Sequence, residues 1–266
     1  MNVLQFIELL SPHLVAELGY KKFNNPQSAK YRDFEKTMDD EAVKSTIEFK
    51  GKNIAIYTWG DGEKKALLIH GWEGRATNFG KLIPILVSKG YQVIGFDAPS
   101  HGRTDKFKNS FATFEHLATF MLEQNKYELL ITHSTGSSFG LWGLHKLNIS
   151  IPKVFICTTP NTVESRFQLT MDQFGLGNKT MKHMMRIFQK DTGHNPDELV
   201  SSQFVQSIDF DQIIFISDEK DKVIPLEWTN TVHEAIPNSE LKLLNGTGHF
   251  RMLWSEQLEA LIEEKA

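Results

Sequence analysis

The sequence contains very little cysteine: Cys157 is the only one among 266 residues. A single cysteine excludes an internal disulfide framework and any zinc or iron–sulfur site built from several cysteines. Long hydrophobic runs are also missing, since no stretch approaches the roughly 20 apolar residues that span a bilayer. Nor is there an excess of positive charge. The 29 basic and 33 acidic residues give a net charge of −4, which provides no reason to expect a nucleic-acid partner.

The N-terminus lacks the pattern of a secretory signal. Residues 1–18 are rich in apolar residues, but Glu8 interrupts them, the first lysine is Lys21, and no small-residue cleavage site follows. We therefore expect a cytoplasmic protein without a membrane partner. Ser11 and Pro12 are typical of a helix start, so residues 2–10 and 12–23 are predicted to form two amphipathic helices.

The composition is that of a globular protein, with 40% hydrophobic and 23% charged residues. Short apolar runs alternate with helical patterns, which predicts an α/β fold with a mostly parallel central sheet and helices on both faces. The first two strands are expected to form a hairpin around Gly51 and Asn53. Strands are predicted at 46–49, 54–59, 66–69, 92–96, 129–132, 154–157, 212–216 and 240–244, and helices near 79–89, 114–125, 136–146 and 255–264.

Residues 161–209, after the sixth strand, break this alternation. They are helical in pattern, and Met181, Met184, Met185 and Phe188 recur at the spacing of one helix face. We expect them to form a helical cap over one end of the sheet. The predicted units are an N-terminal helical extension and linker at 1–45, an α/β core at 46–160 and 210–266, and the cap at 161–209.

A serine stands between a predicted strand and a predicted helix. The strand 129–132 leads into His133-Ser134-Thr135-Gly136, where Ser134 is followed two residues later by a glycine. This segment resembles the nucleophile elbow, G-x-S-x-G, of the α/β-hydrolase fold family. Thr132 replaces the first glycine of that pattern, so a β-branched side chain must fit into a tight turn. The alternative interpretation of Ser134 is a helix-capping serine.

Two loops earlier in the chain strengthen the resemblance. His70-Gly71-Trp72-Glu73-Gly74 follows the third predicted strand, and the family places an oxyanion-hole donor in such a segment. The loop 96–104, which contains Asp97 and His101, is similar to a loop that shapes the floor of the family's site. We expect structural roles for both of these residues.

Two segments near the C-terminus complete the pattern. The loop after strand 212–216 resembles the family's acid loop, whose register selects Asp221 over its rivals Asp218 and Glu219. His249 follows a glycine-rich loop behind the last strand, as the family's catalytic histidine does. The order Ser134, Asp221, His249 is that of α/β hydrolases.

The resemblance implies a serine hydrolase with a Ser134–Asp221–His249 triad, in which His249 acts as the general base. By the same analogy the backbone N–H groups of Trp72 and Thr135 form the oxyanion hole. Neither a metal nor an organic cofactor is expected. Cys157 lies on a predicted buried strand and is interpreted as inert packing.

The substrate is expected to be a small or medium ester or thioester. Its predicted pocket residues are Trp72, His133, Met171, Phe174 and Met184, although the apolar cap residues could equally dock the cap on the core. Two alternatives remain: a carbon–carbon bond hydrolase of the same fold, and a non-catalytic ligand-binding member. The expected partner is a small acyl substrate, with the protein a monomer or homodimer.

Overall fold

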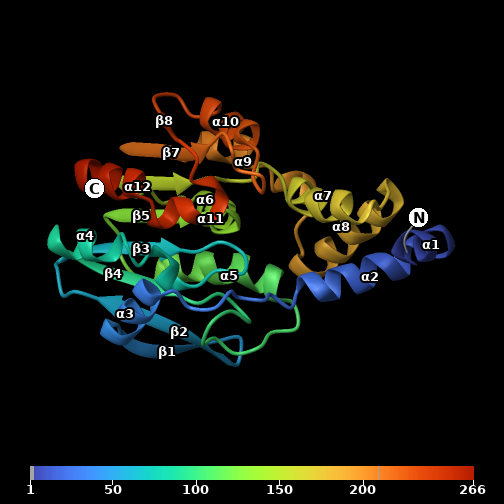
Figure 1. Ribbon diagram of the computed structural model, residues 1–266, viewed down its shortest axis with the longest axis horizontal. Helices are drawn as coiled ribbons and strands as arrows, with labels where there is room; N and C mark the ends of the chain where they lie inside the picture. The colour runs from blue at the N-terminus through green and yellow to red at the C-terminus, as the bar shows by residue number, and fades with distance from the viewer. Residues whose placement is uncertain (1–2, 209) are drawn as a thin grey trace.

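A single eight-stranded sheet forms the centre of the computed structural model, which describes residues 3–208 and 210–266, except for the side chains of residues 169 and 170 (Figure 1). The strand order is β1-β2-β4-β3-β5-β6-β7-β8. The pairs β1–β2 and β2–β4 are antiparallel and all others are parallel. The strands are β1 Val43–Phe49, β2 Lys52–Trp59, β3 Lys64–Ile69, β4 Tyr91–Phe96, β5 Leu129–His133, β6 Lys153–Cys157, β7 Gln212–Asp218 and β8 Glu240–Leu244.

The fold class and every strand predicted from the sequence are confirmed, with shifts of up to three residues at the strand ends. The predicted hairpin is also present, since β1 and β2 pair in antiparallel register. Its turn residues Lys50 and Gly51 both have positive φ, at 50° and 73°. Such a turn matches the right-handed twist of the flanking strands.

Helices cover both faces of the sheet because alternate strand residues point to opposite sides. Leu67 and Ile69 of β3 belong to a buried cluster that includes residues of α5 (Ser110–Glu123) and α6 (Thr135–Leu147). Ala66 and Leu68 belong to a second cluster with α4 (Ile83–Ser88) and α12 (Glu256–Lys265). Cys157 lies in this second cluster, and burial raises the pKa of its thiol to about 12, as expected for an inert packing residue.

The N-terminal region forms three helices where two were predicted. α1 (Val3–Leu10) and α2 (Pro12–Phe23) match the expectation, although residue 2 lies outside the described residues. The Ser11 hydroxyl caps α2 by accepting a hydrogen bond from the Leu14 N–H at 3.3 Å. The segment 24–45, predicted to be a linker, also contains α3 (Asp33–Glu41). Tertiary contacts hold this polar helix, since Met38 is buried and its carbonyl accepts a hydrogen bond from the Trp59 indole at 2.8 Å.

Between β6 and β7 the chain forms only helical elements within the described residues, apart from one isolated bridge between Thr162 and Val200. Met181, Met184 and Phe188 are buried, as their predicted helix face requires. Residue 209, the predicted end of the cap, lies outside the described residues, and the three predicted units stay predictions. The elements are α7 Val163–Phe174, α8 Asn178–Thr192, η2 Pro196–Glu198, α9 Ser201–Phe204 and η3 Val205–Ser207.

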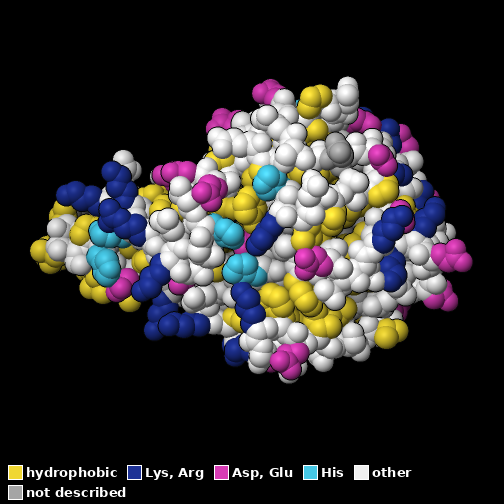
Figure 2. All heavy atoms as spheres, turned by 180° about the vertical axis from the view of Figure 1, so that it is seen from behind, with side chains coloured by type: hydrophobic (Ala, Val, Ile, Leu, Met, Phe, Trp, Pro, Cys, Tyr) yellow, Lys and Arg dark blue, Asp and Glu magenta, His cyan; other side chains and the backbone are white. Residues whose placement is uncertain are grey.

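Helices α1, α2, α7 and α8 project together from one end of the sheet (Figure 1). Lysine, arginine and histidine side chains gather beside hydrophobic ones on this projection, on the face that Figure 2 displays. Within the described residues, no helix has both the length and the apolar character needed to cross a membrane. The remaining elements are η1 Ala76–Phe79, α10 Leu226–Glu234, α11 Gly248–Arg251 and η4 Met252–Trp254.

Candidate active site

Ser134 lies in a strained turn between β5 and α6. Its φ of 56° and ψ of −123° fall in a region that non-glycine residues rarely adopt, and such strain is concentrated at functional sites. Gly136 explains why the turn can be so tight. A Cβ atom at Gly136 would lie 2.3 Å from the carbonyl oxygen of His70, so only glycine lets α6 approach the end of β3. The turn therefore has the geometry that the sequence predicts.

The loop after β3 lies directly against Ser134. A Cβ atom at Gly71 would lie 2.9 Å from the Cβ atom of Ser134, so the backbone leading to Trp72 passes close to the serine. Thr135 is the first residue of α6, where backbone N–H groups have no partner within the helix. Within the described part of the chain, the N–H groups of Trp72 and Thr135 donate no hydrogen bond to other protein groups. Both are thus free to bind an oxyanion.

Asp221 and His249 form a buried pair. The His249 Nδ1 lies 2.8 Å from the Asp221 Oδ2. The other carboxylate oxygen, Oδ1, accepts hydrogen bonds from the backbone N–H groups of Val223 and Ile224, each at 2.8 Å. These three contacts fix the carboxylate and therefore orient the imidazole, whose Nε2 remains available for proton transfer.

His133 brings the His249 loop next to the elbow. Its Nε2 donates a hydrogen bond to the carbonyl oxygen of His249 at 3.0 Å, and the two rings lie 4.7 Å apart. Burial is the main reason that the pKa of His133 lies well below its usual value, with a further contribution from His249. His133, the residue before Ser134, is therefore neutral and connects the elbow to the loop that carries His249.

Asp218 has a positioning role that the sequence did not reveal. Its Oδ2 accepts hydrogen bonds from the backbone N–H and the hydroxyl of Thr247 and from the backbone N–H of Gly248. Its Oδ1 accepts a hydrogen bond from the backbone N–H of Lys220. Burial by itself would raise the pKa of this carboxyl, but the hydrogen bonds lower it overall. Asp218 thus holds the loop that carries His249, whereas Glu219 is exposed. The register of the acid loop singled out Asp221 in the sequence, but it contained no signal for the role of Asp218.

A model of the alpha/beta hydrolase fold matches residues 67–190, which include Ser134. The chain has the α/β-hydrolase fold. It is 23% identical over 270 residues to the uncharacterized hydrolase YugF of Bacillus subtilis, with 84% of this chain and 97% of that protein covered.

Two solved structures share the fold. The thioesterase domain from the curacin biosynthetic pathway matches with a TM-score of 0.62 and 15% identity, covering 84% of this chain and 99% of that chain. The esterase Pf2001 of Pyrococcus furiosus matches with a TM-score of 0.62 and 17% identity, covering 90% of this chain and 95% of that chain.

The unusual Thr132 of this α/β hydrolase fits its elbow without exposing a polar group. The side chain is fully buried, and its hydroxyl is 2.9 Å from the hydroxyl of Ser137 on α6. Its methyl group faces Gly140, where a Cβ atom would lie 3.1 Å away. Because Gly140 has no side chain, it leaves room on α6 for the methyl group of Thr132.

Asp97 and His101 have the structural roles that were predicted, since both hold the loops next to the site through hydrogen bonds. The Asp97 carboxylate accepts hydrogen bonds from the Tyr57 hydroxyl and from the N–H groups of Ala76 and Arg103. His101 Nδ1 donates to the carbonyl of Pro99, and its Nε2 accepts from the N–H of Glu73. Both ring nitrogens of His101 therefore make hydrogen bonds to backbone groups, so neither is available to accept a proton from a substrate or from Ser134.

The buried histidines of this hydrolase predict acid sensitivity. Burial lowers the pKa of His70 to about 4 and that of His101 to about 3, against 6.5 in an unfolded chain. Below about pH 6.5 the unfolded state binds protons that the folded state does not, so the free energy of unfolding should fall between pH 6.5 and pH 4. Urea unfolding at pH 7 and pH 5 should show a smaller loss of stability for His101→Gln than for the parent protein. An equal loss in both proteins would exclude His101 as a source of the acid sensitivity.

Two cavities flank the elbow. One is lined by Thr135, Ser138 and residues of the segment after β6, including Arg166 and Leu199, and its free volume is about 20 Å³. The other is about 360 Å³ and is lined by Trp72 and His133, together with parts of the 27–35 and 250–254 segments. Arg166 was not predicted. Its Nε lies 3.4 Å from the Thr135 hydroxyl, which places a positive charge beside the first residue of α6.

The predicted pocket residues divide into two groups. Trp72 and His133 line the larger cavity. Among the described residues that line the two cavities, Met171, Phe174 and Met184 are absent. Met171 and Met184 lie in the buried cluster that also contains Ala16 and Tyr20 of α2, and Phe174 lies beneath Lys22, whose Nζ is 5.6 Å from its ring. Helices α2 and α8 pack against each other, a contact that the sequence did not indicate. The assignment of Met171, Phe174 and Met184 to the substrate pocket stays a prediction.

Proposed function

We propose that this α/β hydrolase is a serine hydrolase that cleaves a small or medium ester or thioester. One observation carries the proposal: the strained Ser134 lies next to two free backbone N–H groups and beside the loop that holds the Asp221–His249 pair. A serine that only capped α6 would need neither the free N–H groups nor the nearby Asp221–His249 pair. The Ser134 hydroxyl in fact makes no capping hydrogen bond to α6.

The proposed reaction begins with attack of the Ser134 Oγ on the acyl carbon. The serine proton moves to the His249 Nε2, and Asp221 stabilises the resulting imidazolium. The negative oxygen of the tetrahedral intermediate binds to the N–H groups of Trp72 and Thr135, each of which typically contributes about 3 kcal/mol. His249 then returns the proton to the leaving alcohol or thiol. Water, deprotonated by His249, attacks the acyl-enzyme and releases the acid.

Turnover of p-nitrophenyl acetate and of an acetyl thioester by the parent protein and by Ser134→Ala tests this function. We expect both substrates to be hydrolysed by the parent protein and neither by the variant. Turnover of a vinylogous diketone with no ester hydrolysis would favour the carbon–carbon bond hydrolase instead. Equal ester hydrolysis by Ser134→Ala would exclude the proposed nucleophile.

The small cavity beside Thr135 predicts a preference for short acyl chains. Its free volume of about 20 Å³ holds little more than one water molecule, and Leu199 forms part of its wall. Leu199→Ala should therefore raise the ratio of kcat/KM for p-nitrophenyl octanoate to that for the acetate by about 10-fold, because added apolar contact favours the longer chain. Leu176→Ala is the matched control, since Leu176 does not line this cavity. An unchanged ratio in Leu199→Ala would place the acyl chain elsewhere.

A further inference from the structure

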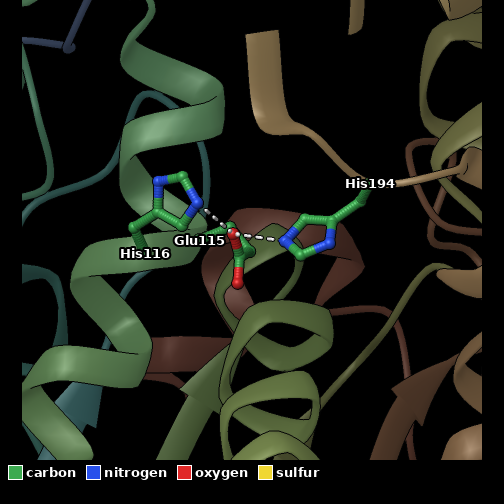
Figure 3. A group of neighbouring side chains, drawn as sticks. All are labelled: Glu115, His116 and His194. Atoms are coloured by element: carbon green, nitrogen blue, oxygen red, sulfur yellow. Dashed lines mark ion pairs between the residues drawn. The ribbon is translucent and has the colours of Figure 1, made fainter. Parts of the chain in front are cut away.

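A buried carboxylate meets two histidines at a point away from the proposed triad. Glu115 and His116 are neighbours on α5, and His194 follows α8 in the segment between β6 and β7. Figure 3 shows both imidazole rings directed toward the Glu115 carboxylate. The His116 Nε2 and the His194 Nε2 lie 3.3 Å and 3.4 Å from the same oxygen, Glu115 Oε2.

The only ion-pair partners that the described residues give the Glu115 carboxylate are these two histidines, and their contacts with it are long. Its side chain is only 2% exposed, yet neither oxygen makes a hydrogen bond of standard geometry within the described residues. The His194 Nε2, which faces it, also makes none. A buried carboxylate without hydrogen bonds is costly, and buried charges in proteins are normally well paired or bound to a metal. The unsatisfied oxygens of Glu115 and the unsatisfied Nε2 of His194 are therefore an unexplained feature of this cluster.

The spacing of the three ligand atoms fits a small divalent cation. All of them lie within 4.8 Å of one another. Zinc binds imidazole nitrogen and carboxylate oxygen at about 2.0–2.2 Å in a tetrahedral arrangement, which puts neighbouring ligand atoms about 3.3 Å apart. The two nitrogen–oxygen distances of 3.3 Å and 3.4 Å match this edge length.

We propose that Glu115, His116 and His194 bind one Zn²⁺ ion, with a water molecule as the fourth ligand. The ion would join α5 of the sheet-covering layer to the segment that follows α8. The ion would also influence the small cavity beside Thr135 through Trp142. The ring centre of Trp142 lies 5.4 Å from that of His194, and Trp142 lines that cavity. No sequence pattern indicates this site, because His194 lies far from the other two ligands along the chain.

Lys50 competes with the ion for His116. Its Nζ lies 2.6 Å from the His116 Nδ1, so its ammonium donates to a ring whose hydrogen is on Nε2. Binding of zinc at Nε2 moves that hydrogen to Nδ1 and obliges the exposed Lys50 side chain to turn away. Lys50→Met should therefore strengthen zinc binding several-fold, which a non-specific surface site would not show.

Titration of tag-free, metal-depleted protein with Zn²⁺ against a chromophoric chelator tests the proposal. We expect one equivalent to bind, with an affinity at least about 100-fold weaker in Glu115→Gln and in His194→Gln, since even second-shell changes cost 10- to 100-fold. Saturating Zn²⁺ should raise the Tm of the parent protein but not of these variants. His194 lies on a surface segment, so His194→Gln remains informative even where Glu115→Gln fails to fold.

His183→Gln is the matched control, because His13 and His183 form another close histidine pair, with ring centres 5.3 Å apart. This variant should bind zinc as the parent protein does. The proposal would be overturned by the absence of stoichiometric binding, by full binding in His194→Gln, or by a loss of binding only in His183→Gln.

Discussion

Asp221→Asn should lower kcat for ester hydrolysis by about 10⁴, the effect typical of replacing the carboxylate of a serine-hydrolase triad by an amide. The physical reason is the contact between Asp221 Oδ2 and His249 Nδ1 at 2.8 Å. An amide nitrogen at this position would repel the Nδ1 hydrogen and favour the wrong tautomer of His249. Initial rates with p-nitrophenyl acetate at several concentrations would separate kcat from KM.

Glu219→Gln is the control for this prediction, because Glu219 lies on the same loop and is exposed. It removes the same charge and should leave kcat unchanged. A kcat for Asp221→Asn within threefold of the parent value would show that the pair with His249 has no part in catalysis.

Gly136→Ala should both destabilise the protein and abolish its activity. The added methyl group would lie 2.3 Å from the His70 carbonyl oxygen and 2.6 Å from that of Ile69, so α6 must move away from β3. Because backbone atoms cannot yield as a side chain does, we expect a cost of about 3 kcal/mol and a fall in Tm of roughly 10 °C. Movement of α6 would also displace the Thr135 N–H from the oxyanion.

Gly19→Ala provides the comparison, since no heavy atom lies within 4 Å of a Cβ built at Gly19 in α2. Alanine is favoured over glycine within a helix, so its Tm should be unchanged or slightly higher. Thermal unfolding of both variants, together with their esterase activity, would test the pair. A Tm of Gly136→Ala equal to that of the parent protein would contradict the close packing of the elbow against β3.

The sheet could be predicted because its strands are short apolar runs bounded by loop residues, as at 66–69 and 129–132. The candidate catalytic residues could be proposed because the segments around them resemble motifs of the α/β-hydrolase family. The resemblance was supported by their position after strand ends that meet at one edge of a parallel sheet. Helix α3 was missed because it is polar, and its position depends on contacts with distant residues such as Trp59.

Contacts between distant segments also account for the other residues that the sequence did not identify. The acid-loop register separated Asp221 from Asp218, but the positioning role of Asp218 depends on its contact with Thr247, which is 29 residues away along the chain. The packing of α2 against α8, and the contact of Lys22 with Phe174, likewise join segments that lie far apart along the chain. Arg166 lies beside Thr135 because of the way α7 packs against the core, and the sequence contains no pattern that predicts this contact.

Intact-mass measurement after treatment with a fluorophosphonate probe tests directly whether Ser134 is a nucleophile, because this reagent reacts with an activated serine. We expect one adduct on the parent protein and none on Ser134→Ala. Cys157, the only thiol, is buried and does not confuse the result. A folded parent protein that stays unmodified, or an equal adduct on Ser134→Ala, would contradict the assignment of Ser134 as the nucleophile.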